Sequence, residues 1–237
     1  MTAPGPTVDD LLDDAALLSL EHQLHLKDLG GPPEDAAVHL LGDADPERGT
    51  FRWVWADPEG HPPAATGLAE WLRGFGEQHG VPVFTRAEIP FAELPGSPAD
   101  AHRVAATMCE LAKPVSGRWT AVLTGDGTVR TAALLDHRSL ELGEPVPARA
   151  LRVLAEGLNE LPITLHRRAL ATYGRLRGLQ VHDNPDGSMS LDMPGLRAVV
   201  RPLPARRADF GPPQHAAEDD GTHHLAGPAV DIKYRFD

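Results

Sequence analysis

The chain has 237 residues, with 22 Lys and Arg against 34 Asp and Glu and a formal net charge of −12. Its length exceeds the commonest size of one domain, about 100–150 residues, and suits either one large domain or two small ones. No run approaches the ~20 apolar residues that span a bilayer, and the acidic residues 1–14 do not resemble a secretory signal, so we expect a cytoplasmic protein without a membrane partner.

The negative charge is unevenly distributed along the chain. Residues 1–144 hold 10 Lys and Arg against 23 Asp and Glu, a net charge of −13. Residues 145–210 hold 10 against 6, a net charge of +4, and residues 211–237 hold 2 against 5. Because nucleic acids and anionic membranes require a positive surface, only the middle segment is suited to binding them.

The first expected element is a helix over residues 8–29, which begins with Thr7 and Asp10 in the spacing of a capping box. A strand follows at residues 37–41. The next expected strand, residues 50–56, alternates Phe51, Trp53 and Trp55 on one face, and together the two strands predict a β-hairpin. This alternation also predicts that both tryptophans are buried.

A helix is expected over residues 64–79, with Gly80 as its stop, and a short buried strand over residues 81–84. The segment 97–100 predicts the start of another helix, in which Ser97 can cap and a following Pro presets the first turn. A second hairpin is expected from residues 119–123 and 129–135. These elements complete a predicted first domain at residues 1–144.

From residue 145 the sequence predicts a smaller module of two helices and β-structure, at residues 145–202. The helices are expected at residues 147–160 and 165–177, and the strands at residues 179–182, 188–192 and 196–200. Residues 203–228 are rich in Pro, Ala and His without periodicity and predict a flexible segment. Alternating apolar residues predict a terminal strand within residues 229–237. The expected fold class is α+β, with helices packed on antiparallel hairpins.

Four segments between residues 10 and 136 form a recognisable series: the runs Glu21–Gln23, Val38–Gly42 and Gly80–Pro82 and, above all, the Gly-Thr-aromatic-x-Trp-x-Trp-Ala strand of Gly49–Ala56. In order and spacing they resemble an uncharacterised bacterial family of unknown function. The chain departs from the family pattern at Phe51, where Trp is common, and in a shortened stretch before the first strand. The resemblance implies an α+β domain; it implies no activity and supplies no catalytic residue.

The residues that could carry metal or covalent chemistry do not form a known motif. His22 and His25 share one face of the first helix, but a zinc site requires three or four converging ligands. The only cysteine, Cys109, lies in an apolar helical stripe, where a thiol is typical of a core. Nucleophile-elbow, phosphate-loop and dinucleotide motifs are absent from the sequence. The sequence therefore predicts neither a metal nor a cofactor.

The tryptophans of the first domain are the leading candidates for binding another protein, since Trp is enriched at interfaces. Three alternating aromatics on a covered sheet are, however, more often part of the core. Arg52, on the opposite face of the strand from Trp53, and Trp71, on the helix at residues 64–79, are then the candidates for contacting a partner.

The order helix, helix, hairpin in the smaller module also resembles a winged helix-turn-helix. In that arrangement its second helix would present four arginines to phosphates: Arg167, Arg168, Arg175 and Arg177. The module's net charge of only +4 and the absence of polar residues suited to base edges argue against nucleic acid. The alternatives are that these arginines are solvated, dock on the acidic first domain or contact a protein partner.

Taken together, these features predict a non-enzymatic interaction or regulatory protein of a bacterial cytoplasm. The partner we expect is another protein. Two alternatives stay open: an enzyme with an unrecognised site, and a nucleic-acid-binding winged-helix module.

Overall fold

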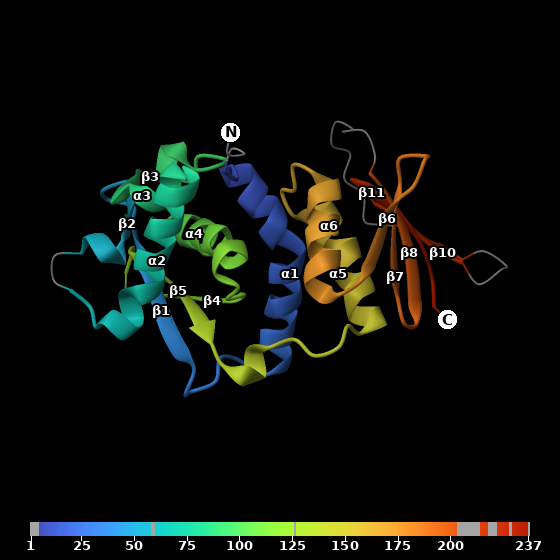
Figure 1. Cartoon of the computed structure of the whole chain (residues 1–237), viewed down its shortest axis with the longest axis horizontal. Coiled ribbons are helices and arrows are strands. Elements are labelled where there is room, and N and C mark those ends of the chain that lie inside the picture. Colours follow the sequence, from blue (N-terminus) through green and yellow to red (C-terminus); the bar gives the residue numbers. More distant parts are fainter. Residues whose placement is uncertain are drawn as a thin grey trace. The chain divides into compact units, whose positions relative to one another are not determined.

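The computed structural model describes residues 5–57, 60–125, 127–202, 214–217, 222–227 and 229–236. Six α-helices and two antiparallel sheets in these residues confirm the predicted α+β class (Figure 1). Within the described residues, no helix combines the length and the apolar character that crossing a bilayer requires.

The described residues separate into two compact units. The first comprises those of Met1–Ala15 and His22–Glu141, and the second those of Ala16–Glu21 and Leu142–Asp237. The sequence places its domain boundary after residue 144 and does not predict that six residues of the first helix belong with the second unit.

Helix α1 (Val8–Asp28) begins with the predicted capping box. The Thr7 hydroxyl accepts a hydrogen bond from the Asp10 amide at 3.1 Å, and the Asp10 carboxylate accepts one from the Thr7 amide at 3.0 Å. These two bonds satisfy amides that the helix itself leaves without a partner.

The first unit is built on a five-stranded antiparallel sheet in the order β3-β2-β1-β5-β4. Its strands are β1 (Ala37–Asp45), β2 (Thr50–Trp53), β3 (Glu88–Pro90), β4 (Thr120–Thr124) and β5 (Arg130–Asp136). The helices are α2 (Pro63–His79), α3 (Pro82–Thr85) and α4 (Ala101–Ser116), with single 3-10 turns at η1 (Val54–Ala56), η2 (Phe91–Glu93) and η3 (Arg138–Leu140). Because α2 and α4 both contact β1, the core of this unit lies between these helices and the sheet.

The core confirms one of the two tryptophan predictions. Trp53 is fully buried, and its indole nitrogen donates a hydrogen bond to the Val83 carbonyl at 2.9 Å. Trp55 is only half-buried, because β2 ends at Trp53 and the chain turns into η1. The same turn buries Val54, which strict alternation would have placed on the outer face.

Two further local predictions in the first unit were wrong. Residues 82–85 form the helical turn α3 instead of a strand, with Pro82 at its first position. Helix α4 is capped by Asp100, whose carboxylate accepts from the amides of His102 and Arg103 at 3.0 and 3.3 Å. Ser97 instead adopts a positive φ of 43° three residues earlier.

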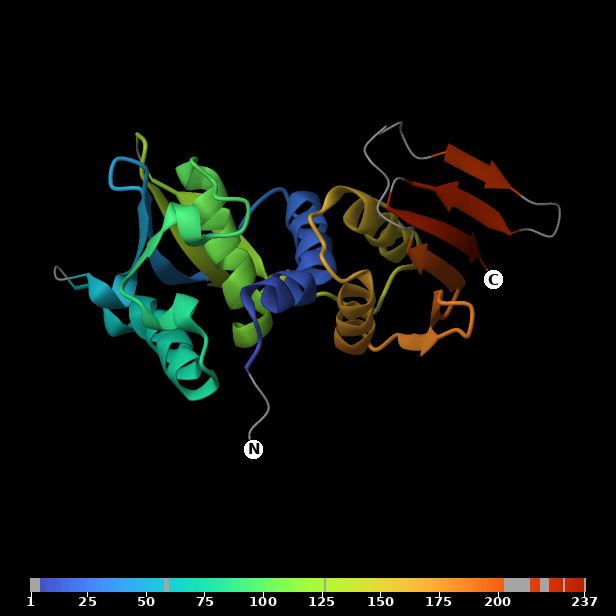
Figure 2. The same cartoon turned by 90° about the horizontal axis from the view of Figure 1, so that it is seen from above.

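The second unit contains helices α5 (Pro147–Glu160) and α6 (His166–Arg177) and a six-stranded sheet in the order β6-β7-β8-β11-β10-β9. Its strands are β6 (Gln180–Asp183), β7 (Met189–Met193), β8 (Leu196–Pro202), β9 (Gln214–Ala217), β10 (His223–Ala226) and β11 (Val230–Arg235). Helix α5 contacts β11 and α6 contacts β6, and Figure 2 shows the two helices beside these strands.

The sheet of the second unit corrects the prediction of a flexible segment at residues 203–228. Within that segment β9 and β10 pair with each other, and β10 pairs with β11. Composition alone could not predict these strands, because their stability comes from pairing with neighbouring strands, β9 with β10 and β10 with β11, rather than from their own apolar pattern. The remaining residues, 203–213, 218–221 and 228, lie outside the described part of the chain.

Candidate functional site

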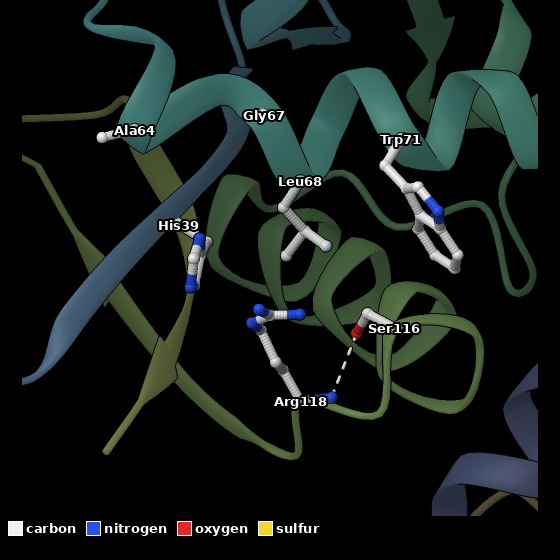
Figure 3. Close-up of a pocket in the computed structure, with 7 residues that line it drawn as sticks. All are labelled: His39, Ala64, Gly67, Leu68, Trp71, Ser116 and Arg118. Atoms are coloured by element: carbon white, nitrogen blue, oxygen red, sulfur yellow. Dashed lines mark hydrogen bonds between the residues drawn. The ribbon is translucent and has the colours of Figure 1, made fainter.

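A pocket of about 390 Å³ lies in the first unit, between α2, β1 and the loop that joins α4 to β4. Figure 3 shows its seven lining residues: His39, Ala64, Gly67, Leu68, Trp71, Ser116 and Arg118. Helix α2 forms one wall with small and apolar side chains. The polar side chains come from β1 and from the end of α4, so the pocket has an apolar side and a polar side.

The polar side is shaped by the end of α4. Gly117 has a φ of 70°, a left-handed conformation in which glycine avoids the strain of a side chain, and its amide donates to the Lys113 carbonyl at 2.9 Å. The chain therefore reverses within one residue. The Ser116 hydroxyl accepts from the Arg118 amide at 3.2 Å, which holds both side chains at the pocket.

Arg118 is the cation of the pocket. Its Nε lies 3.3 Å from the Asp136 carboxylate, and the two side chains are 32% and 54% exposed. An ion pair this exposed is weak, contributing about 0–1 kcal/mol, because water and salt screen it. In Figure 3 the guanidinium points into the space beneath Leu68, where a bound anion could reach it.

His39 faces the same space from β1. Burial lowers the pKa of its imidazole, the positive charge of Arg118 lowers it further, and Asp136 acts in the opposite direction. The ring is therefore neutral at pH 7. Its Nε2 atom is buried and, within the described residues, forms no hydrogen bond. A buried nitrogen without a partner is uncommon in folded proteins, so this atom has a hydrogen-bonding capacity that the described residues do not use.

Trp71 provides the apolar side. Its indole is 52% exposed although it is one of the largest apolar side chains of the unit, and it stacks on Phe75 at a centroid distance of 6.1 Å. Beside it, Leu68 is buried, and a Cβ added at Gly67 would meet no atom within 4 Å. The pocket can thus cover the face of a ring or a short aliphatic chain.

Of the two partner-binding residues predicted in the first unit, only Trp71 lies at this pocket. Arg52, on β2, is directed to Asp57 at 4.0 Å instead. Sequence reasoning missed His39, Ser116 and Arg118 because they are single residues in separate elements, joined by no spacing that a motif could reveal.

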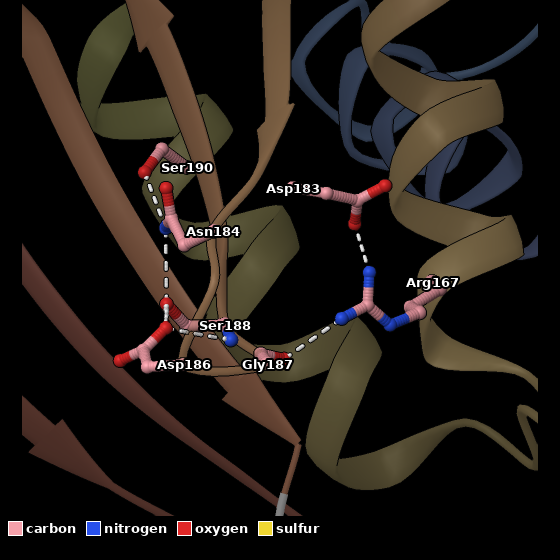
Figure 4. A network of polar contacts seen from close by, with 7 residues as sticks. All are labelled: Arg167, Asp183, Asn184, Asp186, Gly187, Ser188 and Ser190. Atoms are coloured by element: carbon pink, nitrogen blue, oxygen red, sulfur yellow. Dashed lines mark hydrogen bonds and ion pairs between the residues drawn. The ribbon is translucent and has the colours of Figure 1, made fainter.

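The four arginines predicted on α6 do not form one cationic face. Arg167 pairs with Asp183 on β6 and donates to the Gly187 carbonyl at 3.0 Å (Figure 4). Arg168 is half-buried and Arg175 is exposed. Arg177 was predicted to face phosphates at the surface with the other three arginines, and the structure corrects this prediction. Its side chain is 9% exposed and lies 2.9 Å from Glu21, which is 1% exposed.

The buried pair of Arg177 and Glu21 includes a third residue of the second unit. The Tyr173 hydroxyl donates to the Glu21 carboxylate at 3.0 Å, and burial, with Glu21 next in importance, raises the pKa of Tyr173 well above its usual range. No sequence spacing predicted this cluster, because Glu21 lies far from α6 along the chain.

The turn between β6 and β7 is a second polar cluster, and it has a structural role. Asp186 accepts from the hydroxyl and the amide of Ser188, and Asn184 donates to Ser188 and Ser190 (Figure 4). The hydrogen bonds from Ser188 lower the pKa of Asp186 to about 2, with a contribution from Arg201. These contacts fix the predicted turn at residues 184–187.

Other residues considered for chemistry are engaged in packing. The His25 Nε2 lies 2.8 Å from the Ser139 carbonyl, and His22 stacks on Trp119 at 6.2 Å. Cys109 is buried, and desolvation raises the pKa of its thiol to about 12. In the part of the chain that the structure describes, no three His, Cys, Asp or Glu side chains are grouped to hold a metal ion.

Comparison with known proteins is informative for one segment. Residues 29–138 match the model of a family of unknown function (DUF6882). This range contains every residue of the pocket but leaves out α1, where the resemblance seen in the sequence began. No curated protein and no solved structure is similar enough to the chain to match it. The segment that holds the pocket is therefore similar to a domain of unknown function.

Proposed function

We propose that the protein is a non-enzymatic binding or regulatory module of a bacterial cytoplasm and that it acts by holding a ligand in the Trp71 pocket. The observation that carries this proposal is the half-exposed indole of Trp71 on the wall of a pocket about 390 Å³ in volume. Binding pockets are concave, mostly apolar and furnished with a few oriented polar groups, and this pocket has all three properties.

A ligand placed against Trp71 would gain free energy by removing apolar surface from water, at about 25 cal/mol per Å². Rotating bonds in Trp are few, so little side-chain freedom is lost when it is covered. The aromatic strand Gly49–Ala56 supports the same pocket indirectly, since Trp53 lies in the core on which α2 packs.

An enzyme is the second candidate, and His39 is the observation that favours it. A neutral imidazole in a pocket is suited to act as a general base. Covalent catalysis would also need a nucleophile within hydrogen-bond reach, and within the described residues no hydrogen bond joins His39 to Ser116. Binding is therefore the better-supported function.

The test is a fragment screen followed by nuclear magnetic resonance on the isotope-labelled full chain. We expect small aromatic and aliphatic fragments to shift the amide signals of Gly67 and Leu68 and the indole signal of Trp71. Trp71→Ala should weaken these fragments by at least about tenfold, whereas Leu29→Ala, which truncates another exposed apolar side chain of the first unit, should not. Fragments that bind the Trp71→Ala protein equally well would refute the proposal.

A further inference from the structure

The polar atoms that line the Trp71 pocket differ in character from the rest of the first unit. The first unit lies within residues 1–144, which carry a net charge of −13, yet none of the seven lining residues is acidic. Of the three with polar side chains, His39 and Arg118 carry N–H groups that can donate to a ligand, whereas the Ser116 hydroxyl already donates to the Lys113 carbonyl at 3.4 Å. A pocket with one cation and a further donor, in an otherwise acidic unit, is complementary to a negatively charged group.

The surroundings of Arg118 indicate how much negative charge the bound group should carry. A guanidinium has five N–H donors in a planar fork that matches the two oxygens of a carboxylate. Its Nε faces Asp136, so within the described residues the outer edge of the fork is left for a ligand. Because Asp136 already offsets part of the positive charge, the site is better matched to a monoanion than to a phosphate dianion.

His39 adds a directional contact. The Nε2 atom is buried without a hydrogen bond inside the described part of the chain, which leaves its hydrogen-bonding capacity unused. With the proton on Nε2, the neutral ring donates to an oxygen of the ligand without adding charge. Figure 3 shows His39 and Arg118 on the same side of the pocket, across from the indole of Trp71.

The opposite wall of the pocket indicates the size and the apolar character of the rest of the ligand. Trp71, Leu68 and Gly67 offer an aromatic face, an aliphatic side chain and an unfilled space on α2. A volume of about 390 Å³ lies near the lower end of the range for ligand pockets and suits a single ring or a short chain.

Building on the proposed function, we infer that the Trp71 pocket binds an apolar monocarboxylate, with its carboxylate on Arg118 and His39 and its apolar body against Trp71 and Leu68. Two sources share this chemistry: a free aromatic or aliphatic acid, and the chain end of a peptide whose last residue is apolar. Both present one carboxylate joined to an apolar group.

The test compares phenylacetate with its uncharged isostere phenylacetamide by calorimetric titration of the full chain. We expect the acid to bind at least about tenfold more tightly, since hydrogen bonds to a charged partner are stronger than neutral ones. Arg118→Gln should weaken phenylacetate by about tenfold and leave phenylacetamide unchanged. The matched control is Arg86→Gln, which removes an exposed arginine paired with Glu93 away from the pocket and should leave both affinities unchanged.

Further arms of the experiment separate the sources and guard against misfolding. The peptide acetyl-Gly-Gly-Phe is titrated with a free and with an amidated chain end, and tighter binding of the free form than of phenylacetate would identify a peptide as the source. Should Arg118→Gln fail to fold, Arg118→Lys replaces it. Arg118→Lys retains the charge but not the fork, and should preserve a reduced preference for the acid.

The outcomes distinguish this inference from the proposed function. Equal binding of phenylacetate and phenylacetamide, with both lost in Trp71→Ala, would overturn the carboxylate inference and leave the binding pocket standing. If no probe binds at millimolar concentration and no fragment shifts the pocket signals, both proposals fail.

Discussion

Trp53 and Trp55 are two residues apart in sequence, but their surroundings differ. Trp53 is enclosed by Phe51 and Phe84 at ring-centroid distances of 5.3 and 5.8 Å and donates its indole hydrogen to Val83. Trp55 is half-buried, and the guanidinium of Arg73 lies 4.5 Å from its ring centroid. Burial, rather than residue type, therefore determines what each tryptophan contributes to stability.

Trp53→Ala is expected to lower the free energy of unfolding by about 3–5 kcal/mol, since it removes a large buried aromatic and leaves a cavity. Trp55→Ala should cost clearly less, because part of its ring already meets water and an exposed cation–π contact contributes only about 0.5–1 kcal/mol. The loss of stability in Trp53→Phe should lie between these two, at about 1–3 kcal/mol, because the Val83 carbonyl loses its hydrogen-bond donor. Urea denaturation measures all three, and equal losses in both alanine variants would contradict the burial argument.

At the scale of single elements, the β6–β7 turn connects local sequence to acid sensitivity. The Asp186 carboxylate is held in its charged form by Ser188, so its folded pKa, about 2, lies below the ordinary value of about 3.9. A carboxyl group whose pKa is lower in the folded than in the unfolded state stabilises the fold at pH values above its unfolded pKa. This stabilisation is lost as the pH falls from about 4 toward 2.

Ser188→Ala removes the hydroxyl that lies 2.6 Å from Asp186 and leaves the backbone hydrogen bond at 3.0 Å. We expect the pKa of Asp186 to rise toward its ordinary value, and the acid-dependent loss of stability to become smaller between pH 4 and 2. Carbon-detected titration of the side-chain carboxyl measures this change. Glu93, whose pKa is lowered by Arg86, is the internal control and should not move. An unchanged Asp186 titration would show that the Ser188 hydroxyl is not the cause.

Elements with strong local signals were predictable, and those that depend on distant partners were not. Helix α5 has the predicted bounds Pro147–Glu160, because Pro at its start and the Leu161–Pro162 break are local signals. Strands β9 and β10 were missed because pairing stabilises them, β10 with β11 and β9 with β10. Residues 81–84 were predicted as a strand, where the structure has the helical turn α3, because a short apolar run has no period that separates strand from helix.

The same distinction explains what could be predicted of the candidate site. Trp71 was predicted to contact a partner from its residue type alone, and that role stays a prediction, whereas His39 and Arg118 meet only because β1 and β4 both pair with β5. Sheet order depends on pairing between distant segments, which no local pattern specifies. The Arg177–Glu21 pair escaped prediction for the same reason.

For the whole molecule, each sheet is completed within one unit. Every strand of the first sheet lies between residues 37 and 136, and every strand of the second lies between residues 180 and 235. The second unit nevertheless includes residues 16–21, which supply the carboxylate for Arg177 and the leucine that lies 2.5 Å from where a Cβ on Gly157 would be. The two units should therefore differ in their ability to fold as fragments.

We expect a fragment of residues 1–141 to fold with Trp53 buried, and a fragment of residues 142–237 to be unstable by comparison. Without Glu21, the fragment 142–237 keeps the hydrogen bond from Arg177 to the Gly143 carbonyl at 3.0 Å but loses the carboxylate that neutralises the arginine, and removing one partner of a buried ion pair costs about 3–5 kcal/mol. Arg177→Met should consequently stabilise the fragment. In the full chain the same substitution should destabilise, since it leaves Glu21 buried without its cation. Arg175→Met, at an exposed position of the same helix, should change the stability of neither the fragment nor the full chain.

Thermal and urea unfolding of the fragment and the full chain, each with and without Arg177→Met, measure whether the substitution raises or lowers stability, with the Arg175→Met variants as controls. A loss of stability on Arg177→Met in both the fragment and the full chain would mean that the arginine contributes through its packing rather than through its pairing with Glu21.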